Sequence, residues 1–197
     1  MTEMWMARPE DADEIGRIWG AGFSEDPVLT WVFAEPDQRA KLDAFFTFLA
    51  REVYVSMGAT TVAEGACAGW TPPDPAPWPD ERGEAFGVLL ASMCADDELE
   101  RLAVLNEGTE AKHPSEPHWY LGILAVDLDH RSQGLGTRIL ARSLETVDAA
   151  GLPAYLESTN PRNITLYERA GFEVVEQVTL PDGPFFTCMW RPARDGS

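Results

Sequence analysis

The sequence predicts an α/β domain built on a mixed, strongly twisted sheet with helices on its faces. Two observations support this prediction. An apolar run over 120–126 leads into a glycine-rich turn and then into a helix-patterned run over 139–147, which is typical of a strand followed by a helix. Strand-like and helix-like runs also follow one another elsewhere along the chain. With 197 residues, 45% of them hydrophobic, we expect a single domain over 1–197 with a substantial core.

The N-terminal part is predicted to be mainly helical. A short edge strand is expected over 5–7, and Asp11 is placed to cap a helix that ends within 23–27. Asp37 is placed to cap a second helix, and 60–70 has the pattern of a β-hairpin. The two helices are identified by apolar side chains at helical spacing, which are Ile15, Ile18, Trp19 and Phe23 in the first and Leu42, Phe45, Phe46, Leu49 and Val53 in the second.

The middle of the chain begins with five prolines within 71–79, which exclude regular structure and predict a stiff surface loop. A long helix is expected from Asp80 and another over 96–106, followed by a loop over 108–117. The remaining predicted elements are strands near 118–127, 153–158, 172–180 and 184–190 and helices near 135–150 and 161–169.

The strong negative charge limits the possible partners. The net charge is −18 and the pI is near 4.4, so nucleic-acid binding through phosphate contacts is excluded because the chain would repel a polyanion. The same charge favours cationic partners, amines among them, and it would also serve solubility alone.

Cysteine usage and the N-terminus predict a cytoplasmic protein. Cys67, Cys94 and Cys188 are odd in number and far apart, as expected of free thiols in a reducing cytosol. The first ten residues lack the basic and apolar regions of a signal peptide. No apolar run approaches the roughly 20 residues of a membrane span, so no membrane partner is expected.

Two histidines near acidic residues raise the question of a metal site. His113 and His118 lie close to Glu110 and Glu116 in the sequence. Their spacing matches no zinc pattern. We therefore interpret them as loop histidines and expect no metal.

The segment from Arg131 to Thr137 is the most informative one. A glycine-rich turn between a strand and a helix gathers free backbone N–H groups that suit a phosphate. A P-loop would need a Lys after the second glycine, and a dinucleotide fingerprint would need a glycine where Ile139 stands. What remains is R-x-x-G-x-G, filled by Arg131, Gly134 and Gly136.

A second segment, 160–172, carries a compatible pattern. Asn160 suits an N-cap, Tyr167 lies on the short helix that follows, and Gly171 suits the position after its end. Together the two segments resemble the pyrophosphate-binding loop and the following motif of the GCN5-related N-acetyltransferases, the GNAT family. The clear resemblance covers about 118–176. It implies a central sheet that splays apart to admit acetyl-CoA, with acetyl-CoA as co-substrate.

The resemblance also assigns roles to the backbone. The N–H groups of about 133–137 would meet the pyrophosphate, and the strand before the loop would pair with the pantetheine and contact the acyl oxygen. Arg131 would add charge, or would instead pair with Asp129. Asn160 would bind the cofactor or serve as a cap. The cofactor-binding residues expected in this way are Leu124, Ala125, Val126, Arg131, Ser132, Gln133, Gly134, Leu135, Gly136, Thr137, Asn160 and Asn163.

Two side chains are the candidates for catalysis. The resemblance implies that Tyr167 acts as general acid, since a phenol is protonated at neutral pH; the alternative is a tyrosine packed on the core. A base is needed because an alkylamine has a pKa near 10. Glu157, Asp127, His118 and Asp26 are the candidates, and Glu157, at a strand end near the expected splay, is selected.

The function expected from these observations is acetyl-CoA-dependent transfer of an acetyl group to the primary amine of a small molecule. The alternatives are a protein N-terminal or lysine acetyltransferase, a non-catalytic acyl-CoA-binding or sensing domain, and a different nucleotide-binding enzyme such as a kinase or reductase. The segments 23–27, 31–37 and 72–79 resemble the puromycin acetyltransferase-like branch. The sequence does not determine the acceptor, the acyl chain length or the oligomeric state. A homodimer with Trp78 or Trp190 at its interface is one alternative.

Overall fold

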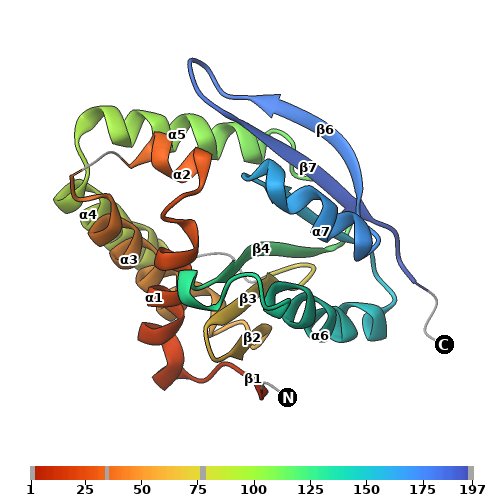
Figure 1. Cartoon of the computed structure of the whole chain (residues 1–197). Helices are drawn as coiled ribbons and strands as arrows, with labels where there is room; N and C mark the ends of the chain where they lie inside the picture. The colour runs from red at the N-terminus through yellow and green to blue at the C-terminus, as the bar shows by residue number, and fades with distance from the viewer. Residues whose placement is uncertain (1–2, 34–35, 76–78, 195–197) are drawn as a thin grey trace.

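The computed structural model describes residues 3–33, 36–75 and 79–194 (Figure 1). Within these ranges the strands form one sheet in the order β1-β2-β3-β4-β5-β7-β6. Adjacent strands run antiparallel except for β4 and β5, which are parallel, so the sheet is mixed as predicted. The strands are β1 (Met4–Met6), β2 (Thr60–Ala63), β3 (Ala66–Thr71), β4 (Trp119–Val126), β5 (Ala154–Ser158), β6 (Glu173–Thr179) and β7 (Phe185–Arg191).

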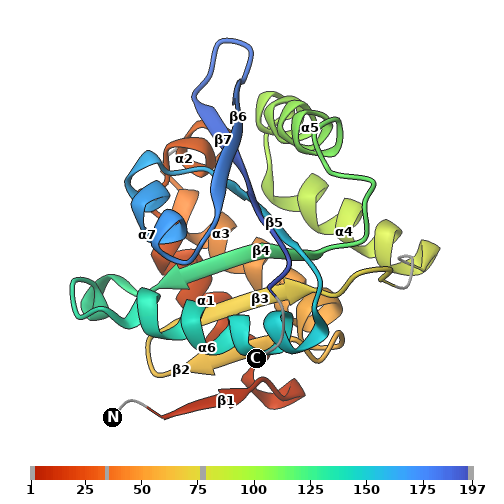
Figure 2. The ribbon, with the colours of Figure 1, turned by 90° about the vertical axis from the view of Figure 1, so that its right-hand side faces the viewer.

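Helices cover both faces of the sheet (Figure 2). Helices α1 and α3 lie on one face and α6 on the other, where it contacts β2, β3 and β4. The α-helices are α1 (Ala12–Phe23), α2 (Pro27–Val32), α3 (Gln38–Leu49), α4 (Asp80–Met93), α5 (Asp96–Glu110), α6 (Leu135–Ala150) and α7 (Ile164–Arg169). Short helical turns are η1 (Pro9–Asp11), η2 (Ala50–Tyr54), η3 (Leu128–His130) and η4 (Pro161–Asn163).

The sheet splays apart between its two central strands. Trp119 pairs with Ala154 and Tyr120 with Tyr155, and beyond these two pairs β4 and β5 diverge (Figure 2). Strand β4 continues to pair with β3, and β5 continues to pair with β7. The expected splayed α/β fold is therefore confirmed, and the backbone of β4 beyond Tyr120 faces a gap where a neighbouring strand would otherwise lie.

A β-bulge in β4 sets which side chains face which core. Ile123 pairs with Gly69 and Leu121 with Trp70, which leaves Gly122 as the extra residue on β4. In a regular strand Leu121 and Ile123 would share a face. Because of the bulge, Leu121 packs in the core below α6, whereas Ile123 packs in the core around α1.

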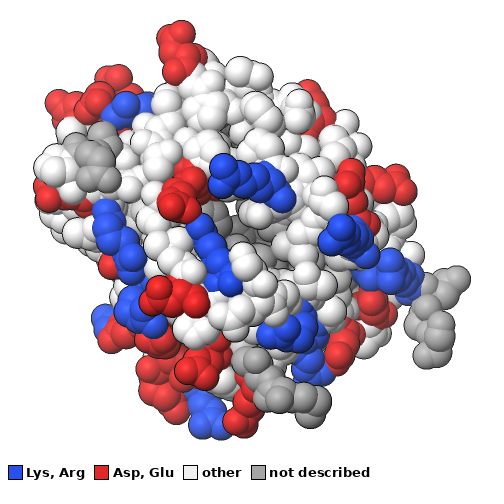
Figure 3. Space-filling view, in the orientation of Figure 1, with Lys and Arg blue, Asp and Glu red and all other residues white. Residues whose placement is uncertain are grey.

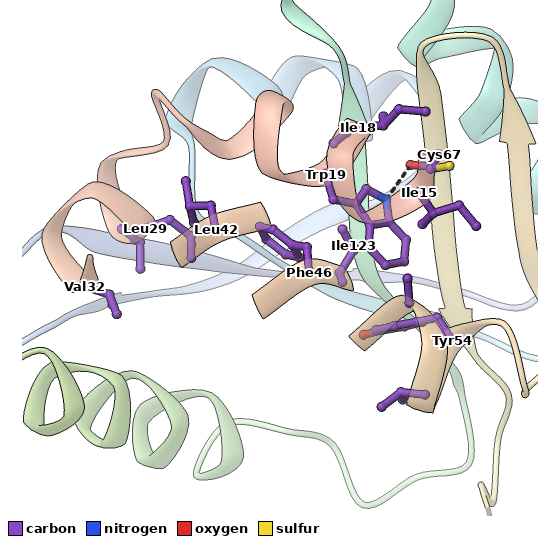
Figure 4. Packing of buried hydrophobic residues seen from close by; sticks show 14 of the residues in the cluster. Ile15, Ile18, Trp19, Leu29, Val32, Leu42, Phe46, Tyr54, Cys67 and Ile123 are labelled. Carbon is purple, nitrogen blue, oxygen red and sulfur yellow. Dashed lines mark hydrogen bonds between the residues drawn. The ribbon is translucent and has the colours of Figure 1, made fainter. Parts of the chain in front are cut away.

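The larger core joins α1, α2 and α3 to the sheet. Trp19 is fully buried there, and its ring packs edge-on against Phe46 and Tyr54. The Trp19 indole N–H donates a hydrogen bond of 3.4 Å to the carbonyl oxygen of Cys67 on β3 (Figure 4). This hydrogen bond gives the buried indole N–H of Trp19 an acceptor, so both packing and the bond fix α1 against the sheet.

Three details of the predicted helices are wrong. Helix α2 was not predicted, although Asp26 followed by Pro27 is a strong start signal: the Asp26 carboxylate accepts bonds of 3.0 Å from the N–H groups of Val28 and Leu29. Asp11 and Asp37 precede α1 and α3, but their side chains make no capping hydrogen bond. Asp11 instead accepts bonds from the Trp5 indole and the Arg8 N–H.

One predicted boundary differs from the structure, and a few of the predicted residues lie outside the described ranges. Helix α5 extends to Glu110, so the predicted loop begins later than expected. Residues 34–35 of the segment 31–37, residues 76–78 of the proline-rich loop, and with them Trp78, lie outside the described residues. Among the helices that the structure describes, none has the length and apolar character needed to cross a membrane.

Two glycine substitutions should have opposite effects on stability. A Cβ on Gly16 of α1 would lie 2.5 Å from the Cα and 2.7 Å from the backbone nitrogen of Thr47 on α3. Gly16→Ala should therefore push the two helices apart and lower the free energy of unfolding by about 2 kcal/mol. Gly87→Ala in α4, where nothing lies within 4 Å, should raise the free energy of unfolding by about 0.5–1 kcal/mol. Urea denaturation measures both, and equal effects would contradict this account of α1–α3 packing.

Candidate active site

A cavity of about 1070 Å³ opens where β4 and β5 diverge. One wall is β4 from Tyr120 to Leu124, and another is β5 and the following turn from Glu157 to Thr159. Aromatic and leucine side chains of α3, α4 and α5 form an apolar third wall, and α7 closes the cavity with Tyr167. The volume is slightly above the roughly 300–1,000 Å³ typical of ligand pockets, so the cavity has room for two reacting molecules.

Of the three strand residues that were predicted to bind the cofactor, one lines this cavity. Leu124 lines it directly. The side chains of Ala125 and Val126 pack into the cores on opposite faces of the sheet. Their side chains are therefore structural, and cofactor binding by their backbone stays a prediction.

The glycine loop is built at the end of β4. Ser132 and Gly134 both have positive φ, +63° and +69°, and Gly134 is the residue before the first turn of α6. A Cβ on Gly136 would lie 3.4 Å from Val126 and 3.9 Å from Leu166, so the start of α6 sits between the end of β4 and α7. The first N–H groups of α6 have no acceptor inside the helix, and the helix dipole makes this end attractive to an anion.

Two arginines flank this loop. The Arg131 guanidinium donates to Glu25 at 2.5 Å and to the carbonyl oxygen of Gly22 at 2.9 Å. The alternative pairing with Asp129 is therefore wrong, since the side chain turns back toward the end of α1. Arg138 donates to the carbonyl oxygen of Gln133 at 2.8 Å. Sequence analysis missed Arg138, although a cation on the first turn of α6 was a visible signal.

The surface at this place contrasts with the acidic composition of the chain. Figure 3 shows a hollow where Figure 1 places β4 between α2 and α7, and Lys and Arg side chains stand beside it. Acidic side chains stand there as well (Figure 3), and Glu25 pairs with Arg131, so the cations near the hollow are partly neutralised. Their presence on a protein with a net charge of −18 still favours the approach of an anionic group.

The segment 160–171 has the geometry predicted for it. The Asn160 side chain accepts a hydrogen bond of 3.1 Å from the Arg162 N–H, and Gly171 ends the helix with φ +94°. Asn163 lines the cavity, whereas Asn160 serves as the cap. Tyr167 is buried, and burial together with the charge of Asp26 raises the pKa of its phenol. The phenol is therefore protonated at neutral pH.

Asp26 connects the two halves of the splayed sheet. It is buried before α2, and its second carboxylate oxygen accepts a bond of 2.7 Å from the hydroxyl of Thr159, in the turn after β5. Burial raises the pKa of Asp26 above its ordinary value of 3.8, although these hydrogen bonds act in the opposite direction. One carboxylate thus holds α2 to β5 beside Tyr167.

Glu157 is the candidate base that reaches the cavity. Its side chain is 4% exposed, and neither carboxylate oxygen has a hydrogen-bond partner among the described residues. Oε1 lies 3.9 Å from Nδ1 of His113, which also lines the cavity. Sequence analysis did not consider His113 as a partner of Glu157 because 44 positions separate them and nothing local connects them.

The other three candidate bases have different surroundings. Asp127 pairs with Arg17 at 3.0 Å, and Asp26 is engaged as described above. His118 contacts the carbonyl oxygen of Glu116 through Nδ1 at 2.6 Å, and desolvation lowers the pKa of its imidazole.

The rings of His113 and His118 pack together, 4.9 Å apart, beside Tyr155. In the described part of the chain, no group of three or more His, Cys, Asp or Glu side chains is placed to hold a metal ion.

The raised pKa of Asp26 makes a prediction about stability and pH. Between pH 3.8 and the higher pKa in the folded state, folded Asp26 binds more protons than unfolded Asp26, so its contribution to stability falls as the pH rises through this window. Asp26→Asn removes this term. The unfolding free energy of the variant minus that of wild type should therefore increase with pH above 3.8, as measured by urea denaturation. A difference that is constant or falls with pH would contradict the prediction.

Comparison with known proteins agrees with this geometry. A protein of Corynebacterium glutamicum described as histone acetyltransferase HPA2 and related acetyltransferase is 25% identical, with a TM-score of 0.72 over 98% of this chain and 97% of that chain. Arylalkylamine N-acetyltransferase 2 from Aedes aegypti is 13% identical, with a TM-score of 0.64 over 98% and 99% of the two chains. A chain of the NatC complex, solved with Gag peptide and CoA, is 12% identical, with a TM-score of 0.55 over 98% and 99%.

A family match covers most of the chain and both motifs. The model of the Acetyltransferase (GNAT) family matches residues 26–172, which include the glycine loop, Glu157 and Tyr167. The chain therefore belongs to the Acetyltransferase (GNAT) family.

Proposed function

We propose that the protein is an acetyl-CoA-dependent N-acetyltransferase that acts on the primary amine of a small molecule. The observation that carries the proposal is the cavity at the β4–β5 divergence, which has buried acid and base candidates in its wall and the glycine-capped start of α6 near one edge. The family match and the similarity to acetyltransferases support it.

The residues around the divergence fit acetyl-CoA. The N–H groups of about Gln133 to Thr137, at the start of a 16-residue helix, would hold the pyrophosphate, with Arg131 and Arg138 adjacent. A Cβ at Gly136 would be in ordinary contact with Val126, so the loop packs directly on the end of β4. The backbone of 124–126 would pair with the pantetheine, and Asn163 would add a polar contact from the cavity wall.

The chemistry would need two proton transfers. Acetyl-CoA supplies the acetyl group as a thioester; the amine nitrogen bonds to the acetyl carbon as the carbon–sulfur bond breaks. Tyr167 would give its phenolic proton to the departing thiolate, and Glu157 would take the proton that the amine loses, with His113 beside it. An N–H of 124–126 that donates to the acyl oxygen would contribute about 3 kcal/mol.

The walls of the cavity favour a small acceptor. Helices α4 and α5 add an apolar wall on the side away from the sheet (Figure 2), which suits the body of a small acceptor, although the cavity also opens to solvent. A protein N-terminus or lysine, a sensing role without turnover, and the puromycin acetyltransferase-like branch stay as alternatives. The similarity to an arylalkylamine N-acetyltransferase also supports a small-molecule acceptor.

Tyr167→Phe should lower kcat by about 100-fold or more while the affinity for acetyl-CoA stays the same, because the variant keeps the buried ring and loses the proton donor. Release of CoA from acetyl-CoA is measured over a panel of small amines and basic peptides. A kcat equal to that of wild type would exclude Tyr167 as the general acid. Binding of acetyl-CoA without turnover on any amine would favour the sensing alternative.

A matched pair of glycines on α6 tests the phosphate site. Gly134 and Gly151 lie just outside the two ends of the helix with φ of +69° and +63°, so alanine at either strains the backbone by about 1 kcal/mol. Gly134→Ala should weaken CoA binding about tenfold, whereas Gly151→Ala should weaken it less than about twofold. Calorimetric titration measures both affinities. Equal affinities of the two variants would place the pyrophosphate elsewhere.

A further inference from the structure

We propose that the acceptor is a primary amine with an apolar body, whose ammonium group binds at Glu157 and whose body lies on the wall formed by α4 and α5. This inference rests on the proposed function and specifies its substrate class. It is carried by two independent features of the cavity, which are a buried carboxylate whose neighbours are three phenols and His113 rather than a lysine or arginine, and a set of apolar side chains that face the cavity.

The carboxylate of Glu157 is buried, and no lysine or arginine pairs with it among the described residues. Its side chain is 4% exposed, and neither oxygen has a hydrogen-bond partner among residues 3–33, 36–75 and 79–194. His113 Nδ1, at 3.9 Å, is too distant for a hydrogen bond. The Tyr120 and Tyr155 phenols interact with the carboxylate, but neither carries a positive charge. A buried carboxylate is costly unless a cation lies against it, so an ammonium group bound at Glu157 would lower this cost.

The groups around Glu157 suit an ammonium ion. Tyr54 and Tyr120 line the cavity with it, and Tyr155 lies beside it in the same strand. Burial, with the charge of Glu157 as the next cause, raises the pKa of all three phenols, so they stay neutral and present aromatic rings without competing charge. Aromatic faces attract ammonium groups, most strongly where water is excluded.

The opposite wall is apolar and incompletely covered. Every residue of α4 is described, and none of the 14 is buried. Phe86 and Leu90 of α4 nevertheless face the cavity, where they are joined by Leu99, Leu102 and Leu105 of α5. Phe86 stacks on Phe48 of α3, with ring centroids 5.0 Å apart, which holds α4 over the cavity. Half-buried apolar side chains that converge on a cavity are typical of a site for an apolar ligand.

The charges of the cavity favour a monoamine over a polycation. Among the described residues that line it, the carboxylates are Glu157 and the exposed Glu110. A polyamine or an aminoglycoside would place further ammonium groups against phenylalanine and leucine side chains, where each loses its hydration without gaining a partner. An alkylamine or arylalkylamine has one charge for Glu157 and an apolar body for the α4–α5 wall.

Direct binding of amines to the protein tests the inference. Calorimetric titration in the presence of CoA compares 2-phenylethylamine, methylamine, spermidine and a short peptide with a free N-terminus. We expect 2-phenylethylamine to bind at least about tenfold more tightly than the other three. Tighter binding of spermidine or of the peptide would overturn the inference.

Two acids of the cavity provide a matched control. Glu157→Gln keeps the shape of the side chain and should weaken binding of 2-phenylethylamine by about 30-fold. Glu110→Gln removes an exposed acid at the same cavity and should weaken it less than about threefold. Unchanged CoA affinity in both variants shows that the fold is intact. A larger effect of Glu110→Gln than of Glu157→Gln would contradict the proposed place of the ammonium group.

The apolar wall is tested with Leu90→Ser, which should lower the preference for 2-phenylethylamine over methylamine about fivefold. An unchanged preference would contradict the place of the apolar body.

Acetylation assays separate the two proposals. If spermidine or the peptide is acetylated in a Tyr167-dependent manner and 2-phenylethylamine is not, the enzyme activity stands and the apolar acceptor is wrong. If 2-phenylethylamine binds through Glu157 but no amine is acetylated, the acceptor class stands and the proposed transfer is wrong.

Discussion

The candidate site depends on the short parallel contact between β4 and β5. Two residue pairs, Trp119 with Ala154 and Tyr120 with Tyr155, hold the halves of the sheet together. Beyond them each strand keeps one partner and leaves its other edge free. This separation opens the cavity and leaves one edge of the 124–126 backbone without a neighbouring strand. It also lets the start of α6 lie close to α7. Asp26, bonded to Thr159, connects the two halves again beside the gap.

Under the proposed function, electrostatics would separate the two substrates. At one end, free N–H groups at the start of α6, with Arg131 and Arg138, suit an anion on a chain that is otherwise strongly acidic. At the other, Glu157 is buried without a hydrogen-bond partner among the described residues and suits a cation. An anionic cofactor and a cationic acceptor would therefore enter different parts of one cavity and meet near Tyr167. This separation of charges is what an enzyme that joins two such molecules requires.

The local signals in the sequence predicted most of the fold and part of the site. The glycine loop, the Asn160 cap and the strand before the loop are short segments in which the pattern itself determines the structure. Long-range relations were not visible in this way. The partner of Arg131 is Glu25, 106 positions away, and the neighbours of Glu157 include residues of the segment after α5, of η2 and of β4. The bulge at Gly122 depends on the pairing of β4 with β3, which a single strand pattern does not encode.

Hydrogen–deuterium exchange with and without CoA tests the central claim most directly, because it reports on the backbone of the divergent strand and of the glycine loop at once. If the β4–β5 gap is the binding site, CoA should slow the exchange of amides in 121–126 and 133–137 and leave the β6–β7 hairpin as it was. Protection confined to other segments, or no protection of 121–126 at saturating CoA, would contradict the claim that the gap holds the cofactor.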